Sequence, residues 1–170
     1  MLLTSLLLAA SAASADCNKV TVVDDPLDGR SVGYHLDFDR HGVTGLTLNY
    51  IQGHWTLRLY AAARGVSSKR GDKQHKARFV VGDDVVMLRA AGRSWPLTGV
   101  RPRTGLFTQW RFDFYISHEK LAALSKDRVR AVGLSLSDLE HRFTLSRRKG
   151  HKLRDALSCA MDQVETVAAK

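Results

Sequence analysis

The amino-acid sequence predicts a mostly β protein of the α+β class: an antiparallel sandwich or open barrel-like sheet, with a short helix and a C-terminal amphipathic helix. Two patterns support this fold class. Apolar and polar residues alternate in many short segments separated by turn residues, which is typical of strands with one buried face. The last segment instead repeats its apolar residues at helical spacing. We therefore expect about eight to ten short strands, followed by that helix.

The first half of the chain predicts an antiparallel meander. Large apolar residues occupy every second position in three segments, with Arg40-His41-Gly42 and Gln52-Gly53 supplying the turns between them. The three segments are 34–38, 46–49 and 54–61. The stretch 64–78 then carries six basic residues, one acid and almost no large apolar side chain, so we expect a loop or a long hairpin tip there.

The second half predicts the remaining strands and both helices. Further short strands are expected at 79–81, 85–88, 95–97, 129–136 and 142–146. The clearest strand of the chain turns four large side chains to one face: Trp110, Phe112, Phe114 and Ile116.

Ser117 is suited to cap a short helix, with Glu119 in its first turn. The C-terminal helix is expected from about 151 to 168, with an apolar stripe formed by Leu153, Leu157, Ala160 and Val164.

Length and composition limit the class of protein. The chain has 170 residues, of which 44% are hydrophobic and 25% charged, and its formal net charge is +9 at pH 7. This balance indicates a packed globular protein and excludes a disordered, collagen-like or coiled-coil chain. No stretch of the body reaches the roughly 18 apolar residues of a membrane span.

The N-terminus predicts export. Residues 1–15 combine a leucine- and alanine-rich core with Ala13-Ser14-Ala15, the small-x-small pattern that signal peptidase accepts. Cleavage is expected before Asp16, which leaves 16–170 as one β-rich domain in the periplasm or outside the cell. The two cysteines of the chain, Cys17 and Cys159, are expected to form a disulfide in that oxidising compartment.

The positive charge is concentrated beyond Asp39, mostly in three stretches: 64–78, 89–103 and 142–154. If the fold joins two of them, the protein presents a basic patch suited to an anionic macromolecule or an acidic protein. The same residues also fit ordinary solvated loops. The binding residues predicted here are Arg147, Arg148, Lys149, Lys152, Lys69, Arg70 and Lys73.

A second group of polar residues offers a catalytic alternative. His35, Asp37 and Asp39 alternate along one expected strand, so they project from one face. They could perform acid–base chemistry or, with a cross-strand partner, bind a metal. Residues two apart on a strand are about 6.6 Å apart, too far for all three to share one ion. The same alternation also fits the solvated face of an ordinary strand.

No serine-hydrolase, zinc-protease or phosphate-loop motif occurs in the chain. The function expected from sequence is therefore an exported, non-enzymatic module that binds an anionic macromolecule or an envelope component without a cofactor or metal. A small exported metal- or His/Asp-dependent hydrolase is the alternative. The sequence predicts neither the partner nor the oligomeric state.

Overall fold

The computed structural model describes residues 17–25, 29–40, 44–68, 75–101, 105–136 and 139–168. The expected signal peptide at 1–15 and three of the predicted binding residues, Lys69, Arg70 and Lys73, lie outside the described residues.

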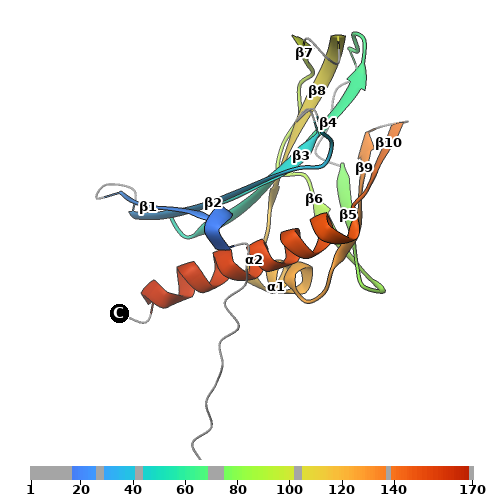
Figure 1. Cartoon of the computed structure of the whole chain (residues 1–170). Helices are drawn as coiled ribbons and strands as arrows, with labels where there is room; N and C mark the ends of the chain where they lie inside the picture. Colours follow the sequence, from blue (N-terminus) through green and yellow to red (C-terminus); the bar gives the residue numbers. More distant parts are fainter. Residues whose placement is uncertain are drawn as a thin grey trace, which may run out of the picture.

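Two antiparallel sheets form most of the structure (Figure 1), which confirms the mostly β, α+β prediction as two separate sheets rather than a closed barrel. The larger sheet has six strands in the order β1-β2-β3-β4-β8-β7. Their bounds are β1 Thr21–Asp25, β2 Gly29–Asp37, β3 Gly45–Ile51, β4 His54–Arg64, β7 Leu97–Arg101 and β8 Gly105–Tyr115.

The smaller sheet has four strands in the order β10-β9-β5-β6. Their bounds are β5 Lys76–Val81, β6 Asp84–Arg89, β9 Val129–Leu136 and β10 Leu139–Thr144. The strand β6 is an edge strand, since it pairs with β5 alone in this sheet. The outer face of this sheet, away from the core, carries much of the basic surface described below.

The alternation seen in the sequence decides which face of each strand is buried. On β8, Trp110, Phe112 and Phe114 are at most 1% exposed, whereas their neighbours Arg111 and Tyr115 are exposed. The same period of two buries Leu57 and Leu59 on β4. The inner faces of both sheets and the buried sides of both helices contribute to one hydrophobic cluster.

Two helices close the core on the inner side of the sheets. The helix α1 spans His118–Ser125, and its N-cap is Ser117, whose hydroxyl accepts a hydrogen bond from the Lys120 backbone N–H, as predicted. The helix α2 spans Arg147–Ala168 and contacts α1, β2 and β9. Figure 1 shows α2 running beneath the larger sheet and reaching the smaller one.

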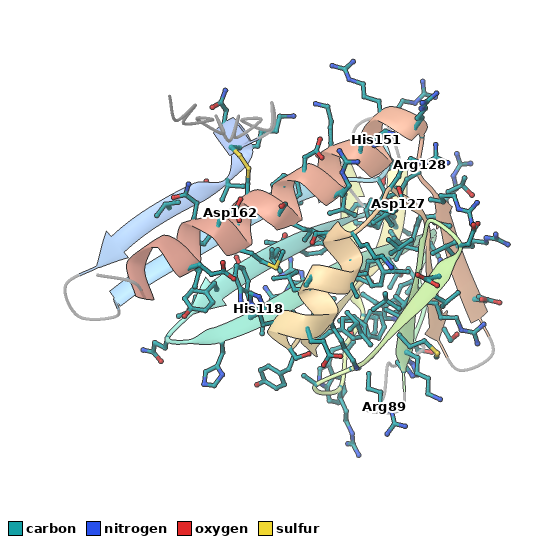
Figure 2. All side chains as sticks on the ribbon, turned by 90° about the horizontal axis from the view of Figure 1, so that it is seen from below. Arg89, His118, Asp127, Arg128, His151 and Asp162 are labelled. Atoms are coloured by element: carbon teal, nitrogen blue, oxygen red, sulfur yellow. A yellow bond between two sulfur atoms is a disulfide. The ribbon has the colours of Figure 1, made fainter. Side chains whose placement is uncertain are left out.

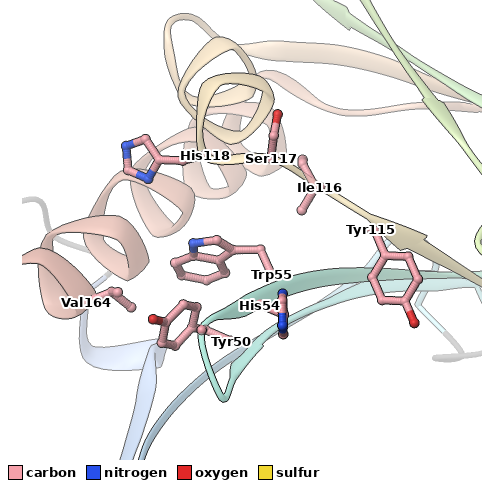
Figure 3. A pocket seen from close by; sticks show the side chains of 9 residues that line it. Tyr50, His54, Trp55, Tyr115, Ile116, Ser117, His118 and Val164 are labelled. Carbon is pink, nitrogen blue, oxygen red and sulfur yellow. The ribbon is translucent and has the colours of Figure 1, made fainter.

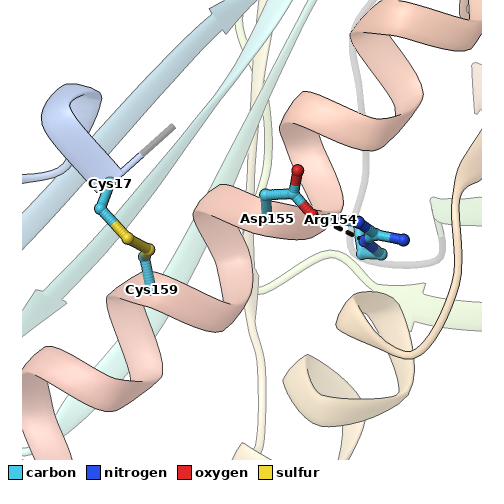
Figure 4. Close-up of a disulfide and its surroundings, with 4 residues drawn as sticks. All are labelled: Cys17, Arg154, Asp155 and Cys159. Atoms are coloured by element: carbon cyan, nitrogen blue, oxygen red, sulfur yellow. Dashed lines mark hydrogen bonds and ion pairs between the residues drawn. A yellow bond between two sulfur atoms is a disulfide. The ribbon is translucent and has the colours of Figure 1, made fainter. Parts of the chain in front are cut away.

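The predicted disulfide is present between Cys17 and Cys159, with their Cα atoms 5.6 Å apart (Figure 4). Cys17 begins a single 3-10 turn, η1, at Cys17–Lys19, and Cys159 is buried on α2. The bridge joins residues 142 positions apart, so it fastens the N-terminal segment to the C-terminal helix.

The structure differs from the sequence prediction at several elements. The strand predicted at 142–146 is β10, at Leu139–Thr144, and the strand predicted at 79–81 begins earlier, at Lys76. The strand β1 was not expected, and it pairs with β2 from Thr21 opposite Gly33 to Asp25 opposite Gly29. The strand predicted at 95–97 lies instead at Leu97–Arg101, and Trp95 is 55% exposed. The helix α2 begins at Arg147 rather than about 151, because Ser146 caps it by accepting a hydrogen bond from the Lys149 backbone N–H.

Candidate functional site

The larger sheet carries a row of polar side chains on the face opposite the core. The register places His35, Thr47, Arg58 and Asp113 next to one another on β2, β3, β4 and β8. Figure 1 shows both helices on the other side of this sheet. This open polar face therefore contains two of the three catalytic candidates predicted from sequence, His35 and Asp37.

His35 links a carboxylate to a hydroxyl on this face. Its Nε2 lies 3.0 Å from Asp37 Oδ1 and its Nδ1 lies 2.9 Å from Thr47 Oγ1. The side chains of His35 and Asp37 are 54% and 48% exposed, so the imidazole and the carboxylate are both open to water. None of the three cavities described below is lined by these residues.

The third candidate, Asp39, closes the connection between β2 and β3. Its carboxylate accepts hydrogen bonds from the backbone N–H of Thr44, at 2.7 Å, and from the Thr44 hydroxyl. These contacts give Asp39 a structural role next to the start of β3. Among the described residues, no group of three His, Cys, Asp or Glu side chains is arranged to hold a metal ion.

The charges at the centre of the open polar face compensate each other. Arg58 donates from Nε to Asp113 Oδ1 at 2.6 Å and from Nη2 to Asp113 Oδ2 at 3.0 Å, the bidentate geometry of a strong ion pair. The hydrogen bond with Asp113 raises the pKa of Arg58 above its ordinary value, so the guanidinium stays charged. A neutralised pair attracts a charged partner weakly.

An aromatic groove of about 500 Å³ opens at the end of the larger sheet (Figure 3). Tyr50 and Trp55 of the β3–β4 hairpin lie on one side, with ring centroids 4.8 Å apart, and α1 begins on the other. His118 Nε2 lies 3.2 Å from Glu165 Oε1 of α2, a contact that joins the two helices beside the groove. The groove has apolar walls and no concentration of one charge.

A cavity of about 460 Å³ next to the first turn of α2 is markedly basic. We call it the helix-end cavity; its lining residues are Gly82, Asp83, Asp127, Arg128, Arg130, Arg147 and His151. Figure 2 shows Arg128, Asp127 and His151 gathered there. The N-terminal end of a helix adds partial positive charge, which favours an anion at this position.

Two acids partly offset the arginines of the helix-end cavity. Asp83 Oδ1 lies 3.2 Å from Arg130 Nη2. Asp127 accepts a hydrogen bond from the backbone N–H of Arg128 at 2.5 Å. The guanidinium groups of Arg128 and Arg147 form no ion pair with any described residue, which leaves a positive charge in the cavity.

The four predicted binding residues on α2 divide into different environments. Arg147 lines the helix-end cavity and Arg148 is exposed beside it. Lys149 donates from Nζ to the backbone carbonyls of Asp37, at 2.9 Å, and Phe38, at 2.8 Å, so it also anchors α2 to β2. Lys152 lies one turn further along the helix and is half-buried.

The outer face of the smaller sheet carries a second group of cations. Lys76, Arg78, Arg89 and Arg142 are all exposed, and we call them the sheet patch. The register sets Lys76 opposite Arg89 and places Arg78 and Arg142 on either side of Gly133. None of the four forms an ion pair with a described residue, and Glu140 is the one acid among the described side chains of this face.

The strand β9 contributes to both basic regions, with Arg130 in the helix-end cavity and Gly133 in the row of the sheet patch. A cavity of about 210 Å³ on the sheet face is lined by Arg78, Arg142, Val80 and Ala131 among others. Arg130 of the helix-end cavity directly precedes Ala131 on β9, and Gly82 follows the end of β5. The fold thus joins cations from all three basic stretches of the sequence.

Sequence reasoning missed several members of this surface. The predicted binding residues did not include Arg128, Arg130 and His151, which reach the helix-end cavity from the loop before β9, from β9 and from α2, respectively. In the sequence, Lys76 and Arg78 alternate with the apolar residues Ala77 and Phe79, which are buried in the structure. This alternation indicates that the two cations share the exposed face of a strand. The sequence does not reveal the strand order, which places β10 and β6 in one sheet so that their cations share a face.

No described helix is long and apolar enough to cross a membrane. Comparison of the chain with family models, with curated proteins and with solved structures finds no match.

Proposed function

We propose that this protein is an exported binding module for an anionic macromolecule or envelope component, and that it binds through the surface formed by the sheet patch and the helix-end cavity. The observation that carries the proposal is the collection of exposed, unpaired cations on one surface, drawn from three separate stretches of the chain. By contrast, Arg58 at the centre of the open polar face is neutralised by Asp113.

Uncompensated surface charge acts over several ångströms and steers an oppositely charged partner, and salt screens this attraction. Binding should therefore weaken as ionic strength rises. A polyanion would engage several cations at once, since each exposed pair alone contributes at most about 1 kcal/mol.

The test is charge reversal on the proposed surface. The triple variant Arg78→Glu/Arg142→Glu/Arg147→Glu should bind heparin, used as a polyanion probe, at least about tenfold more weakly at low salt, because three favourable contacts become repulsive. Fluorescence titration at several salt concentrations measures both the affinity and its salt dependence. Circular dichroism would establish that the variant remains folded.

A matched control changes charge elsewhere. Arg64→Glu/Arg111→Glu alters exposed arginines on the open face of the larger sheet, and His35→Ala/Asp37→Ala removes the alternative site. Both should leave heparin binding within about twofold of the wild type. Binding that is insensitive to salt and to the triple reversal would overturn the proposal.

Export is part of the same proposal. The disulfide between Cys17 and Cys159 is compatible with an oxidising compartment. Intact mass of the protein from an exporting host should correspond to a chain that starts at Asp16, with both thiols resistant to alkylation until reduction. A full-length mass with two reactive thiols would contradict export.

A further inference from the structure

The outer face of the smaller sheet combines its cations with exposed aliphatic side chains. Val85 and Met87 on the edge strand β6 are 57% and 42% exposed. The register places Val85 opposite Val80 and Met87 opposite Arg78, so the apolar side chains lie beside the sheet patch. We propose that the partner is an anionic lipid surface, with the sheet patch on the headgroups and with Val85 and Met87 inserted between them.

This inference rests on the proposed function and names the class of its partner. Cations close to an anionic bilayer surface each strengthen binding about fivefold. Apolar side chains strengthen membrane binding further when they enter the boundary between the headgroups and the acyl chains. The combination on one face therefore fits a lipid surface better than a polyanion in water, which gives Val85 and Met87 no apolar environment.

The composition of the face distinguishes a lipid surface from a single-stranded nucleic acid. Proteins that bind single strands provide aromatic side chains on which the bases stack. The described side chains of this face include none that is aromatic; they are Lys76, Arg78, Val80, Val85, Met87, Arg89, Ala131, Gly133, Ser135, Glu140, Arg142 and Thr144. Lipid binding needs no stacking partner.

A lysine occupies one hydrogen-bond acceptor on the open edge of the smaller sheet. An exposed edge strand invites strand addition, which proteins commonly prevent with a lysine. Here Lys120 of α1 donates from Nζ to the backbone carbonyl of Met87 at 3.3 Å, which occupies an acceptor on the open edge. The side chain of Met87 remains accessible on the outer face while its carbonyl is covered.

Gly133 supplies a place for a headgroup phosphate. It lies between Arg78 and Arg142 in the cross-strand row and lines the cavity of about 210 Å³. A Cβ atom at this position would lie 3.8 Å from Glu140 Oε1 and 3.9 Å from Arg78 Cβ, which is ordinary contact. The fold therefore does not require glycine here, and glycine weakens a strand while it allows a ligand to approach the backbone.

The experiment measures sedimentation of the mature protein with vesicles. Wild-type protein should bind vesicles that contain phosphatidylglycerol and phosphatidylcholine, and should bind pure phosphatidylcholine at least about tenfold more weakly. Val85→Ser/Met87→Ser should lower the partition coefficient on anionic vesicles about tenfold or more, because two apolar contacts with the bilayer are lost. The same variant should elute from heparin at the wild-type salt concentration.

A second variant tests the phosphate position without removing a charge. Gly133→Val should weaken vesicle binding by filling the cavity between the two arginines, while its thermal midpoint should equal or exceed that of the wild type. Matched controls are Ile51→Ser and Val66→Ser, which change exposed aliphatic residues outside this face. Both should bind vesicles as the wild type does.

The outcomes separate this inference from the proposed function. Retention on heparin without vesicle binding would overturn the lipid surface and leave an anionic polymer as the partner. Equal binding of the wild type and Val85→Ser/Met87→Ser to anionic vesicles would also overturn insertion. Failure to bind either probe would refute both proposals. A concentration-dependent dimer that masks the face would identify a second copy as its partner and overturn the lipid surface.

Discussion

At the scale of single residues, His141 couples the fold to pH. Its Nε2 is buried without a hydrogen-bond partner among the described residues, and burial lowers its pKa below the ordinary value of 6.5. The ring stacks on Phe143, with centroids 6.3 Å apart, and lies 5.9 Å from Trp110. The native state therefore holds His141 neutral in an aromatic environment.

Stability should fall as the pH drops below 6.5, the ordinary pKa of this side chain. The unfolded chain then binds a proton at His141 that the native state does not bind, so acid favours unfolding until the lower native pKa is reached. His141→Phe should keep the aromatic packing and reduce the loss of unfolding free energy between pH 7.5 and 5.5. Urea unfolding at both pH values measures this loss of unfolding free energy.

The control for this prediction is His54→Gln, which changes an exposed histidine at a turn. It should leave the acid-dependent loss of stability unchanged. If His141→Phe loses as much stability as the wild type over the same pH range, His141 is not the group responsible.

At the scale of elements, the sequence predicted those whose pattern is local and strong. The strand through Trp110 and Phe114 and the helix capped by Ser117 were predicted because alternation and capping depend on near neighbours. β1 was missed because its five residues, Thr21–Asp25, end in two acids and bury little; what orders them is pairing with β2.

The early start of α2 has a similar cause. Gly150 is a poor helix former, and a helix beginning after it was the natural prediction. In the structure a Cβ atom at Gly150 would lie 2.3 Å from the backbone carbonyl oxygen of Val129, so glycine is required for the helix to pack on β9. The sequence pattern does not reveal this close approach, because it depends on Val129, at the start of the preceding strand β9.

The sequence predicted that the candidate site would be basic, but it did not predict which residues form it. The composition of the chain shows three basic stretches. The sequence predicted a basic patch only on the condition that the fold joins two of these stretches. Which cations share a face depends on the strand order β10-β9-β5-β6, a long-range property. The hydrogen bond between His35 and Asp37, by contrast, follows from their spacing of two on one strand.

At the scale of the whole molecule, charge is distributed unequally between the two sheets. The larger sheet pairs Arg58 with Asp113 on its open face, whereas the sheet patch has four cations and one described acid. The sheet patch is therefore a local excess of positive charge among the described residues. Such an excess would favour an approach of the smaller sheet to an anionic surface.

The disulfide determines how firmly the two ends of this molecule are held. A bridge between residues 142 positions apart restricts the unfolded chain strongly, and the chain-entropy model gives a stabilisation of up to about 5 kcal/mol. Cys17→Ala/Cys159→Ala should therefore lose about 2 to 5 kcal/mol of unfolding free energy, measured by urea denaturation.

Reduction of the wild type should lower the urea midpoint to nearly that of the double variant, since both remove the same constraint on the unfolded state. The variant should still bind heparin, because Cys159 lies on the part of α2 that faces η1, away from the first turn that lines the helix-end cavity. Equal midpoints for oxidised and reduced protein would show that the bridge does not stabilise the native state.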